Sequence, residues 1–132
     1  VKKAVEKISV GQEDKEMTLE QFYAYIGGDY QGTLSRLPSE KLILKFVRKY
    51  VDDPTCAQLD QAVEVKDWET AFRAAHTLKG VSQNLGFDKL YQTSAALTEA
   101  MRGSKPLEDY SLWEAVDKVH KEIIEAVGKL ED

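Results

Sequence analysis

The chain has 132 residues, of which 42% are hydrophobic and 31% charged, with a net charge of -5. This length suits one domain that buries its own core without disulfides or metal, and the single cysteine, Cys56, excludes an internal disulfide. The acidic balance argues against a nucleic-acid partner, which needs a basic stripe, and disfavours contact with an anionic membrane, while no apolar run is long enough to span a bilayer.

Residues 1–16 are charged and only weakly periodic, so they fit a helix, a tail or a linker. Thr18 followed by Gln21 has the spacing of a capping box, which predicts that ordered structure starts there. We therefore assign residues 1–17 to an N-terminal extension or linker and residues 18–132 to one folded domain.

Apolar residues recur at helical spacing almost throughout the domain, and no stretch alternates as a strand does. A short helix is predicted from Thr18 to Gly27-Gly28, and a second over residues 29–37, before Pro38. Ser39 is the expected cap of a third helix. Its predicted buried face consists of Leu42, Phe46, Val47 and Tyr50.

Four further helices are predicted in the second part of the chain. Asp53-Pro54 ends the preceding helix, and Thr55 with Gln58 has the spacing of a second capping box. Asp67 is the expected cap of a helix over residues 68–85, which Gly86 would end in a left-handed conformation. The next helix starts at Asp88, carries the stripe Leu90, Ser94, Leu97 and Met101, and ends by Gly103. Ser111 with Glu114 resembles a third capping box, opening a last helix with Val116, Val119, Ile123, Val127 and Leu130 on one face.

Several of these helices are long enough to cross a small domain, and the loops between them are short. Short loops favour antiparallel neighbours. The predicted fold is all-α, an antiparallel up-down four-helix bundle with short additional N-terminal helices.

The helix over residues 68–85 carries the polar residues of interest. On a helical wheel its apolar residues gather on one side and predict the buried face: Ala71, Ala74, Ala75, Leu78, Val81 and Leu85. His76 falls on the opposite side, so we expect an exposed histidine in the middle of a helix.

Gly80 lies one turn beyond His76 on the same face. A glycine inside a helix costs about 1 kcal/mol relative to alanine. The apolar period continues to Leu85, so Gly80 is predicted to be interior, where the missing side chain would leave the imidazole open to a large approaching group.

Two cations, Arg73 and Lys79, lie three residues either side of His76. Both would stabilise phosphoryl oxygens on the imidazole by charge-assisted hydrogen bonds. Gln83, two turns along, could add another hydrogen bond, and Phe72, at the edge between the polar and buried faces, is a candidate for packing and for contact with a partner.

The run Ala75-His76-Thr77-Leu78-Lys79-Gly80, followed by Leu85-Gly86, resembles the His-x-x-Lys-Gly signature of histidine-containing phosphotransfer (HPt) domains, and the resemblance extends over roughly residues 18–130. It implies that His76 is the phosphoacceptor and that Lys79 and Gly80 are the lysine and glycine of the signature. It also implies a four-helix bundle and receiver domains as partners. A histidine kinase is a further partner in such systems.

The chain lacks a phosphate-binding loop and the kinase motifs. We therefore expect a phosphotransfer carrier with no kinase site, no cofactor and no metal of its own, and with Mg²⁺ bound by the partner receiver domain. His120, on the apolar stripe of the last helix, is expected to be a core or boundary residue, and Cys56 a small buried apolar one.

The resulting hypothesis is a phosphorelay intermediate that takes a phosphoryl group from a receiver aspartate onto His76 and passes it to another receiver. Two alternatives stay open: a helical module that docks receivers without transferring phosphate, and an HPt domain cut from a hybrid sensor kinase. No secretory signal is evident, so a cytoplasmic protein is expected, and the resemblance implies a monomer.

Overall fold

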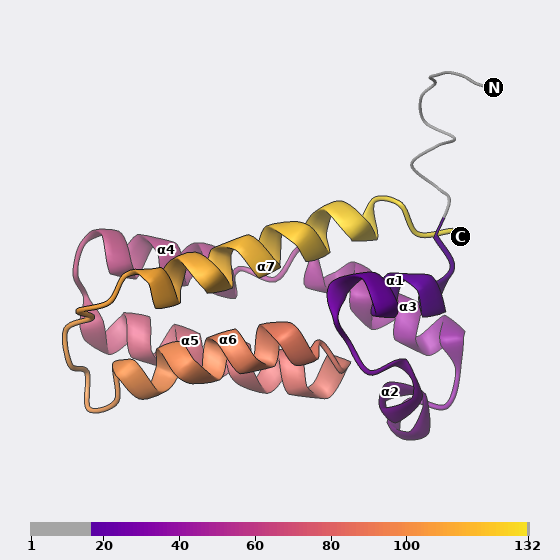
Figure 1. Ribbon diagram of the computed structural model, residues 1–132, viewed down its shortest axis with the longest axis horizontal. Coiled ribbons are helices and arrows are strands. Elements are labelled where there is room, and N and C mark those ends of the chain that lie inside the picture. Colours follow the sequence, from indigo (N-terminus) through magenta and orange to yellow (C-terminus); the bar gives the residue numbers. More distant parts are fainter. Residues whose placement is uncertain (1–16, 132) are drawn as a thin grey trace, which may run out of the picture.

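The computed structural model describes residues 17–131, and over these residues the regular secondary structure is helical apart from one isolated bridge. Its helices are α1 (Leu19–Ile26), α2 (Tyr30–Arg36), α3 (Glu40–Tyr50), α4 (Thr55–Glu64), α5 (Trp68–Leu85), α6 (Asp88–Ala100) and α7 (Ser111–Val127). The all-α class and the helical bundle predicted from the sequence are confirmed (Figure 1).

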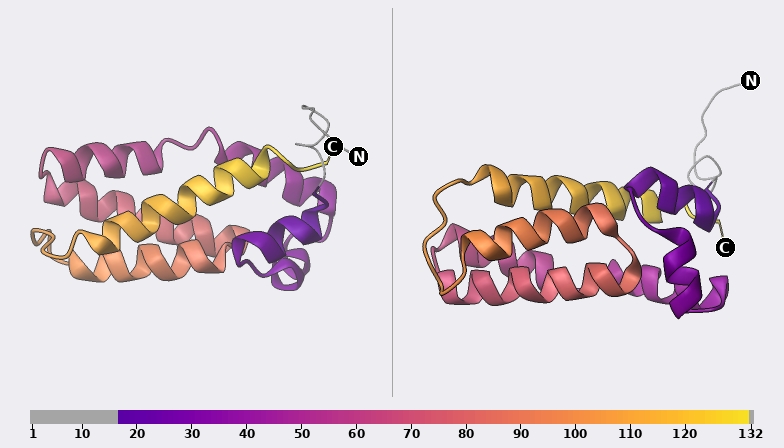
Figure 2. Two further views of the ribbon diagram at one scale, coloured as in Figure 1. Left: turned by 45° about the horizontal axis from the view of Figure 1, so that its top comes forward. Right: turned by 60° about the horizontal axis from the view of Figure 1, so that its bottom comes forward.

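The bundle is built around α5, which packs on α4 and on α6, while α6 also packs on α7. Helices α3 and α4 follow one another along one edge of the bundle, separated by the break at Asp53-Pro54 (Figure 2). Helices α1 and α2 close the end where α5 finishes and α6 begins. None of the described helices is both long and apolar enough to cross a membrane.

An aromatic cluster joins this closed end to the bundle. Phe22 and Tyr23 of α1, Tyr50 of α3 and Phe87 between α5 and α6 are all buried, and their rings make contacts at centroid distances of 5.4 to 6.0 Å. Tilted and edge-to-face contacts of this kind add to the hydrophobic stabilisation of a core. The short helices are therefore part of the same core as the long ones.

Several predicted helix ends are confirmed. Thr18 and Gln21 form the capping box of α1, Ser39 caps α3, and the Asp67 side chain accepts a hydrogen bond from the Thr70 amide at the start of α5. Gly86 ends α5 with a φ of 71°. The caps at Asp67 and Gly86 fix where α5 begins and ends.

The capping boxes predicted at Thr55 with Gln58 and at Ser111 with Glu114 are wrong. Thr55 and Ser111 are the first residues of α4 and α7 rather than their caps. In each case an aspartate two residues earlier takes the amide instead: Asp53 Oδ1 lies 2.8 Å from Thr55 N, and Asp109 Oδ1 lies 3.0 Å from Ser111 N. Asp side chains readily form such turns, and they shift the start of the helix.

The predicted buried face of α3 is also partly wrong. Val47 and Tyr50 are buried as expected, but Ile43 replaces Leu42 and Phe46, and Phe46 is 36% exposed. The reason is that α3 meets the core only along a narrow strip.

The two ends of the described chain pair with each other. The Met17 amide donates to the Lys129 carbonyl at 2.8 Å, and the Glu131 amide donates to the Met17 carbonyl at 2.8 Å. Leu130 is buried as predicted, but it lies beyond α7, in the bridge to Met17. The extension predicted for residues 1–17 lies, up to residue 16, outside the described residues.

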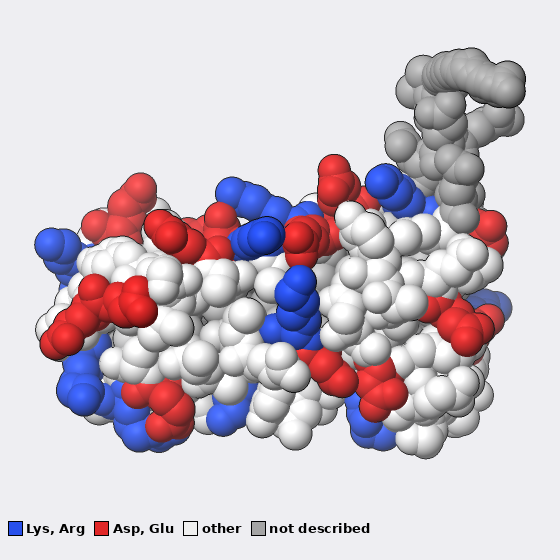
Figure 3. Space-filling view, in the orientation of Figure 1, with Lys and Arg blue, Asp and Glu red and all other residues white. Residues whose placement is uncertain are grey.

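Acidic and basic side chains are interspersed over the face shown in Figure 3. Lys89 Nζ of α6 lies 3.8 Å from Glu122 Oε1 of α7. The face shown in Figure 3 presents no extended basic stripe.

Candidate functional site

Helix α5 presents His76 to solvent because small and apolar residues hold its other side against the bundle. Ala71, Ala75 and Leu78 are fully buried, and they pack between α4 and α6. His76 lies opposite them and is exposed, as the sequence predicts. An imidazole in this position is accessible to another protein without any opening of the bundle.

Gly80 is exposed and lies inside α5, which continues to Leu85. A Cβ added at Gly80 would meet no atom within 4 Å. The packing of the domain therefore does not require glycine at this position. Its effect is on the outer surface, where it leaves an open notch one turn from His76.

The two predicted cations are placed differently. Arg73 Nη1 lies 3.4 Å from Glu69 Oε2, so its guanidinium is directed along the helix away from His76. Both groups are largely exposed, and such a pair contributes little to stability. Lys79 is partly buried and directs its charge toward α6, where it helps to lower the pKa of Glu99.

Phe72 is half-buried at the edge of α5, as expected, and its ring stacks on that of His76. The ring centroids are 6.1 Å apart and the planes are inclined by 16°. Because Phe72 is packed against the core, it limits the positions that the imidazole can adopt. Gln83 is exposed on the same helix, two turns beyond His76.

The structure adds one cation that the sequence analysis missed. The Arg102 guanidinium carbon lies 5.7 Å from the centre of the Phe72 ring, a distance that allows a cation–π contact. Arg102 Nε also donates to Glu99 Oε1 at 3.1 Å, and this hydrogen bond is the main cause of the lowered pKa of Glu99.

Arg102 follows the end of α6, so its approach to Phe72 depends on how α6 lies against α5. The sequence predicts that α5 and α6 are antiparallel neighbours, but it does not predict which residues meet between them. The side of His76 that faces α6 therefore carries Lys79, Glu99 and Arg102 as well as Phe72.

The Hpt domain family model matches residues 53–129, more than half of the chain and all of α4 to α7. The chain belongs to the HPt domain family. HPt domains carry out histidine phosphotransfer in phosphorelays and work with the receiver domains of two-component systems. Comparisons with curated proteins and with solved structures give no match.

The second histidine of the HPt domain has a structural position. His120 is partly buried on α7, where its Nδ1 lies 2.6 Å from the hydroxyl of Tyr50, and burial lowers its pKa. Cys56 is buried, and burial raises the pKa of its thiol to about 12. Among residues 17–131, no cluster of three or more His, Cys, Asp or Glu side chains is arranged to hold a metal ion.

Proposed function

We propose that His76 is the phosphoacceptor of this HPt domain, taking a phosphoryl group from the aspartate of one receiver domain and passing it to the aspartate of another. The observation that supports this most directly is the surface around His76. The imidazole is exposed in the middle of α5, and the next turn of its face is the open notch at Gly80.

In the forward step one imidazole nitrogen attacks the phosphorus atom of the receiver's aspartyl phosphate. An N–P bond forms while the P–O bond to the aspartate breaks, and the aspartate leaves as a free carboxylate. The step requires the imidazole and the acyl phosphate to be in line, so positioning contributes most of the rate. The reverse of this step, on a second receiver, returns the histidine to its starting state.

The groups beside His76 have matching roles in this proposal. Phe72 holds the imidazole by stacking, and Lys79 supplies positive charge for the phosphoryl oxygens. We assign the Mg²⁺ that phosphoryl transfer uses to the receiver domain, so that the HPt domain acts as a carrier with no kinase site of its own.

The test is to mix the protein with a phosphorylated receiver domain and Mg²⁺ and to follow acid-labile phosphate on the chain by intact mass. We expect one phosphoryl group on the wild type and none on His76→Gln, with unchanged circular dichroism. His120 is the built-in control, because it remains in the variant. Label that persists on His76→Gln would contradict the assignment, and receivers that bind without transfer would indicate a docking module instead.

A further inference from the structure

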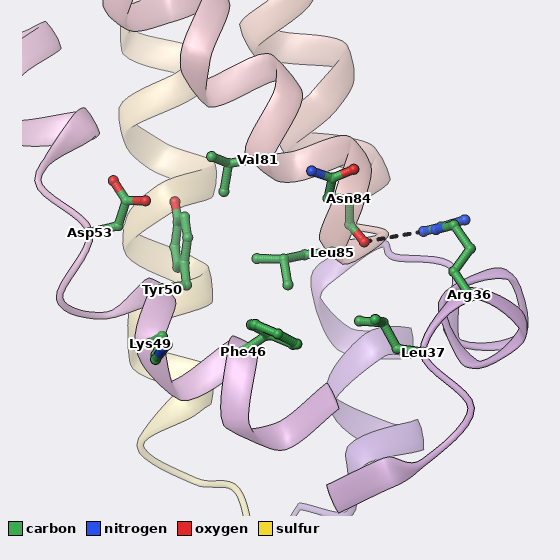
Figure 4. A pocket seen from close by; sticks show the side chains of 9 residues that line it. All are labelled: Arg36, Leu37, Phe46, Lys49, Tyr50, Asp53, Val81, Asn84 and Leu85. Carbon is green, nitrogen blue, oxygen red and sulfur yellow. Dashed lines mark hydrogen bonds between the residues drawn. The ribbon is translucent and has the colours of Figure 1, made fainter. Parts of the chain in front are cut away.

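A groove of about 420 Å³ lies between α2, α3 and the last turns of α5. Its lining is mainly apolar, and the apolar residues are Leu37, Phe46, Tyr50, Val81 and Leu85 (Figure 4). Phe46 was expected in the core from the sequence, but its side chain lines the groove and the residue is 36% exposed.

The groove begins on the flank of α5, beside the exposed face that carries His76. Asn84 is the exposed α5 residue that lines it, one turn beyond Gly80 and two turns beyond His76, which corresponds to about 12 Å along the helix axis. A partner domain that covers His76 with an interface of ordinary size, about 800 Å² per partner, extends roughly 16 Å from its centre and would reach the groove at Asn84.

Charged groups flank the apolar floor. Arg36 lies on one side, where Nη2 donates to the Asn84 carbonyl at 3.4 Å, and Lys49 lies on the other, with Asp53 beyond it (Figure 4). A complementary partner presents an apolar side chain with carboxylates beside it.

We propose that this groove binds an apolar side chain of the receiver domain, one that is flanked by acidic residues and lies beside the phosphorylated aspartate. The HPt domain would then select among receivers by the side chain that each presents to Phe46. This inference rests on the proposed function, because the same docking event brings the receiver aspartate to His76.

The test compares two pairs of matched variants in transfer from phosphorylated receivers. Phe46→Ala is matched with Tyr25→Ala, which truncates another exposed aromatic, 55% exposed on α1 and outside the groove. Lys49→Glu is matched with Lys41→Glu, an exposed lysine of α3 outside the groove. We expect Phe46→Ala and Lys49→Glu each to raise KM about tenfold, with kcat within twofold of the wild type, and the controls to change neither.

A KM within twofold of the wild type for Phe46→Ala would overturn the inference. If Phe46→Ala instead changes the oligomeric state of the protein and leaves KM unchanged, the groove binds a second copy of the chain, and the inference is also overturned. Binding of receivers to His76→Gln separates the two proposals. If receivers bind this variant, and if Phe46→Ala added to it weakens binding about tenfold, the groove is a docking site whether or not His76 is the phosphoacceptor.

Discussion

At the scale of single residues, the surface of α5 near His76 is shaped by what Gly80 lacks. The space around Gly80 is empty, so the domain gains no packing from a glycine there. An exposed glycine in a helix interior costs about 1 kcal/mol relative to alanine. We infer that the open surface at Gly80 serves the approach of a partner and lowers the stability of the fold. Substitutions at Gly80 can measure these two effects, on transfer rate and on stability, separately.

Gly80→Ala and Gly80→Gln should both stabilise the domain, by about 0.5 to 1 kcal/mol, because both residues favour helix more than glycine does. Their effects on transfer should differ. Alanine adds one methyl group and should leave the rate within about threefold, whereas glutamine should slow transfer at least tenfold by filling the notch. Urea denaturation and transfer kinetics check the two parts separately, and equal transfer rates for the two variants would remove this explanation of Gly80.

Arg102 shows a second residue-scale feature, a cation shared between two neighbours. Its guanidinium pairs with Glu99 and lies over Phe72. The charge of the pair is exposed to solvent, so the ion pair itself contributes little.

At the scale of elements, the last turn of α5 is held by donors from α1 and α2. The Leu85 carbonyl accepts from the Tyr23 hydroxyl at 2.6 Å and from Thr33 Oγ1 at 3.2 Å, and the Asp29 amide donates to the Gly86 carbonyl at 2.8 Å. Terminal carbonyls of a helix need partners of this kind. The two short helices thus fix the end of the helix that carries His76.

Gly86→Ala should destabilise the domain more than Gly103→Ala. Both glycines have a positive φ, 71° and 76°, so both substitutions carry the strain of a left-handed residue, of order 1 kcal/mol. Only at Gly86 would the added Cβ collide, since it would lie 1.8 Å from Thr33 Oγ1, whereas at Gly103 it meets nothing within 4 Å.

The difference in unfolding free energy between these two variants, measured by urea denaturation, reports how tightly α2 is packed on the end of α5. We expect Gly86→Ala to lose at least 1 kcal/mol more than Gly103→Ala. Equal losses would mean that α2 moves aside at no cost.

At the scale of the whole molecule, a polar contact joins the end of α3, where the α3–α4 edge of the bundle is interrupted, to the last helix, α7. The hydroxyl of Tyr50, at the end of α3, lies 2.6 Å from Nδ1 of His120 on α7. Burial lowers the pKa of His120, although the carboxylates of Asp60, Asp117 and Asp53 act in the opposite direction. The folded domain therefore favours the neutral imidazole.

This predicts a loss of stability in mild acid. Because the pKa of His120 is lower in the folded than in the unfolded state, the unfolded chain binds more protons as the pH falls through about 6.5. The free energy of unfolding should thus decrease between pH 7.5 and pH 5.5, and His120→Gln should show a smaller decrease over the same range. Urea denaturation at the two pH values measures this. Parallel losses in the two proteins would assign the pH dependence to other groups.

The helices and the exposure of His76 can be predicted from sequence patterns alone. Apolar spacing sets the buried side of a long helix such as α5, and local caps at Asp67 and Gly86 set its ends. His76 and Gly80 follow from this directly, because both lie on α5, whose two ends were predicted correctly. Its buried face differs from the prediction in two neighbouring residues, since Ser82 is buried and Val81 only partly so. The assignment of His76 as the phosphoacceptor stays a prediction until the labelling experiment is done.

The features formed where separate elements meet depend on tertiary packing and could not be predicted. Phe46 lines a groove because α3 meets the core along a narrow strip, and Arg102 reaches Phe72 because α6 lies against α5. The starts of α4 and α7 were also misplaced, since Asp53 and Asp109 compete for the same amides. Helical periodicity predicts which side of a segment is buried. Which side chains meet between two helices depends on how the helices pack, and periodicity does not predict that.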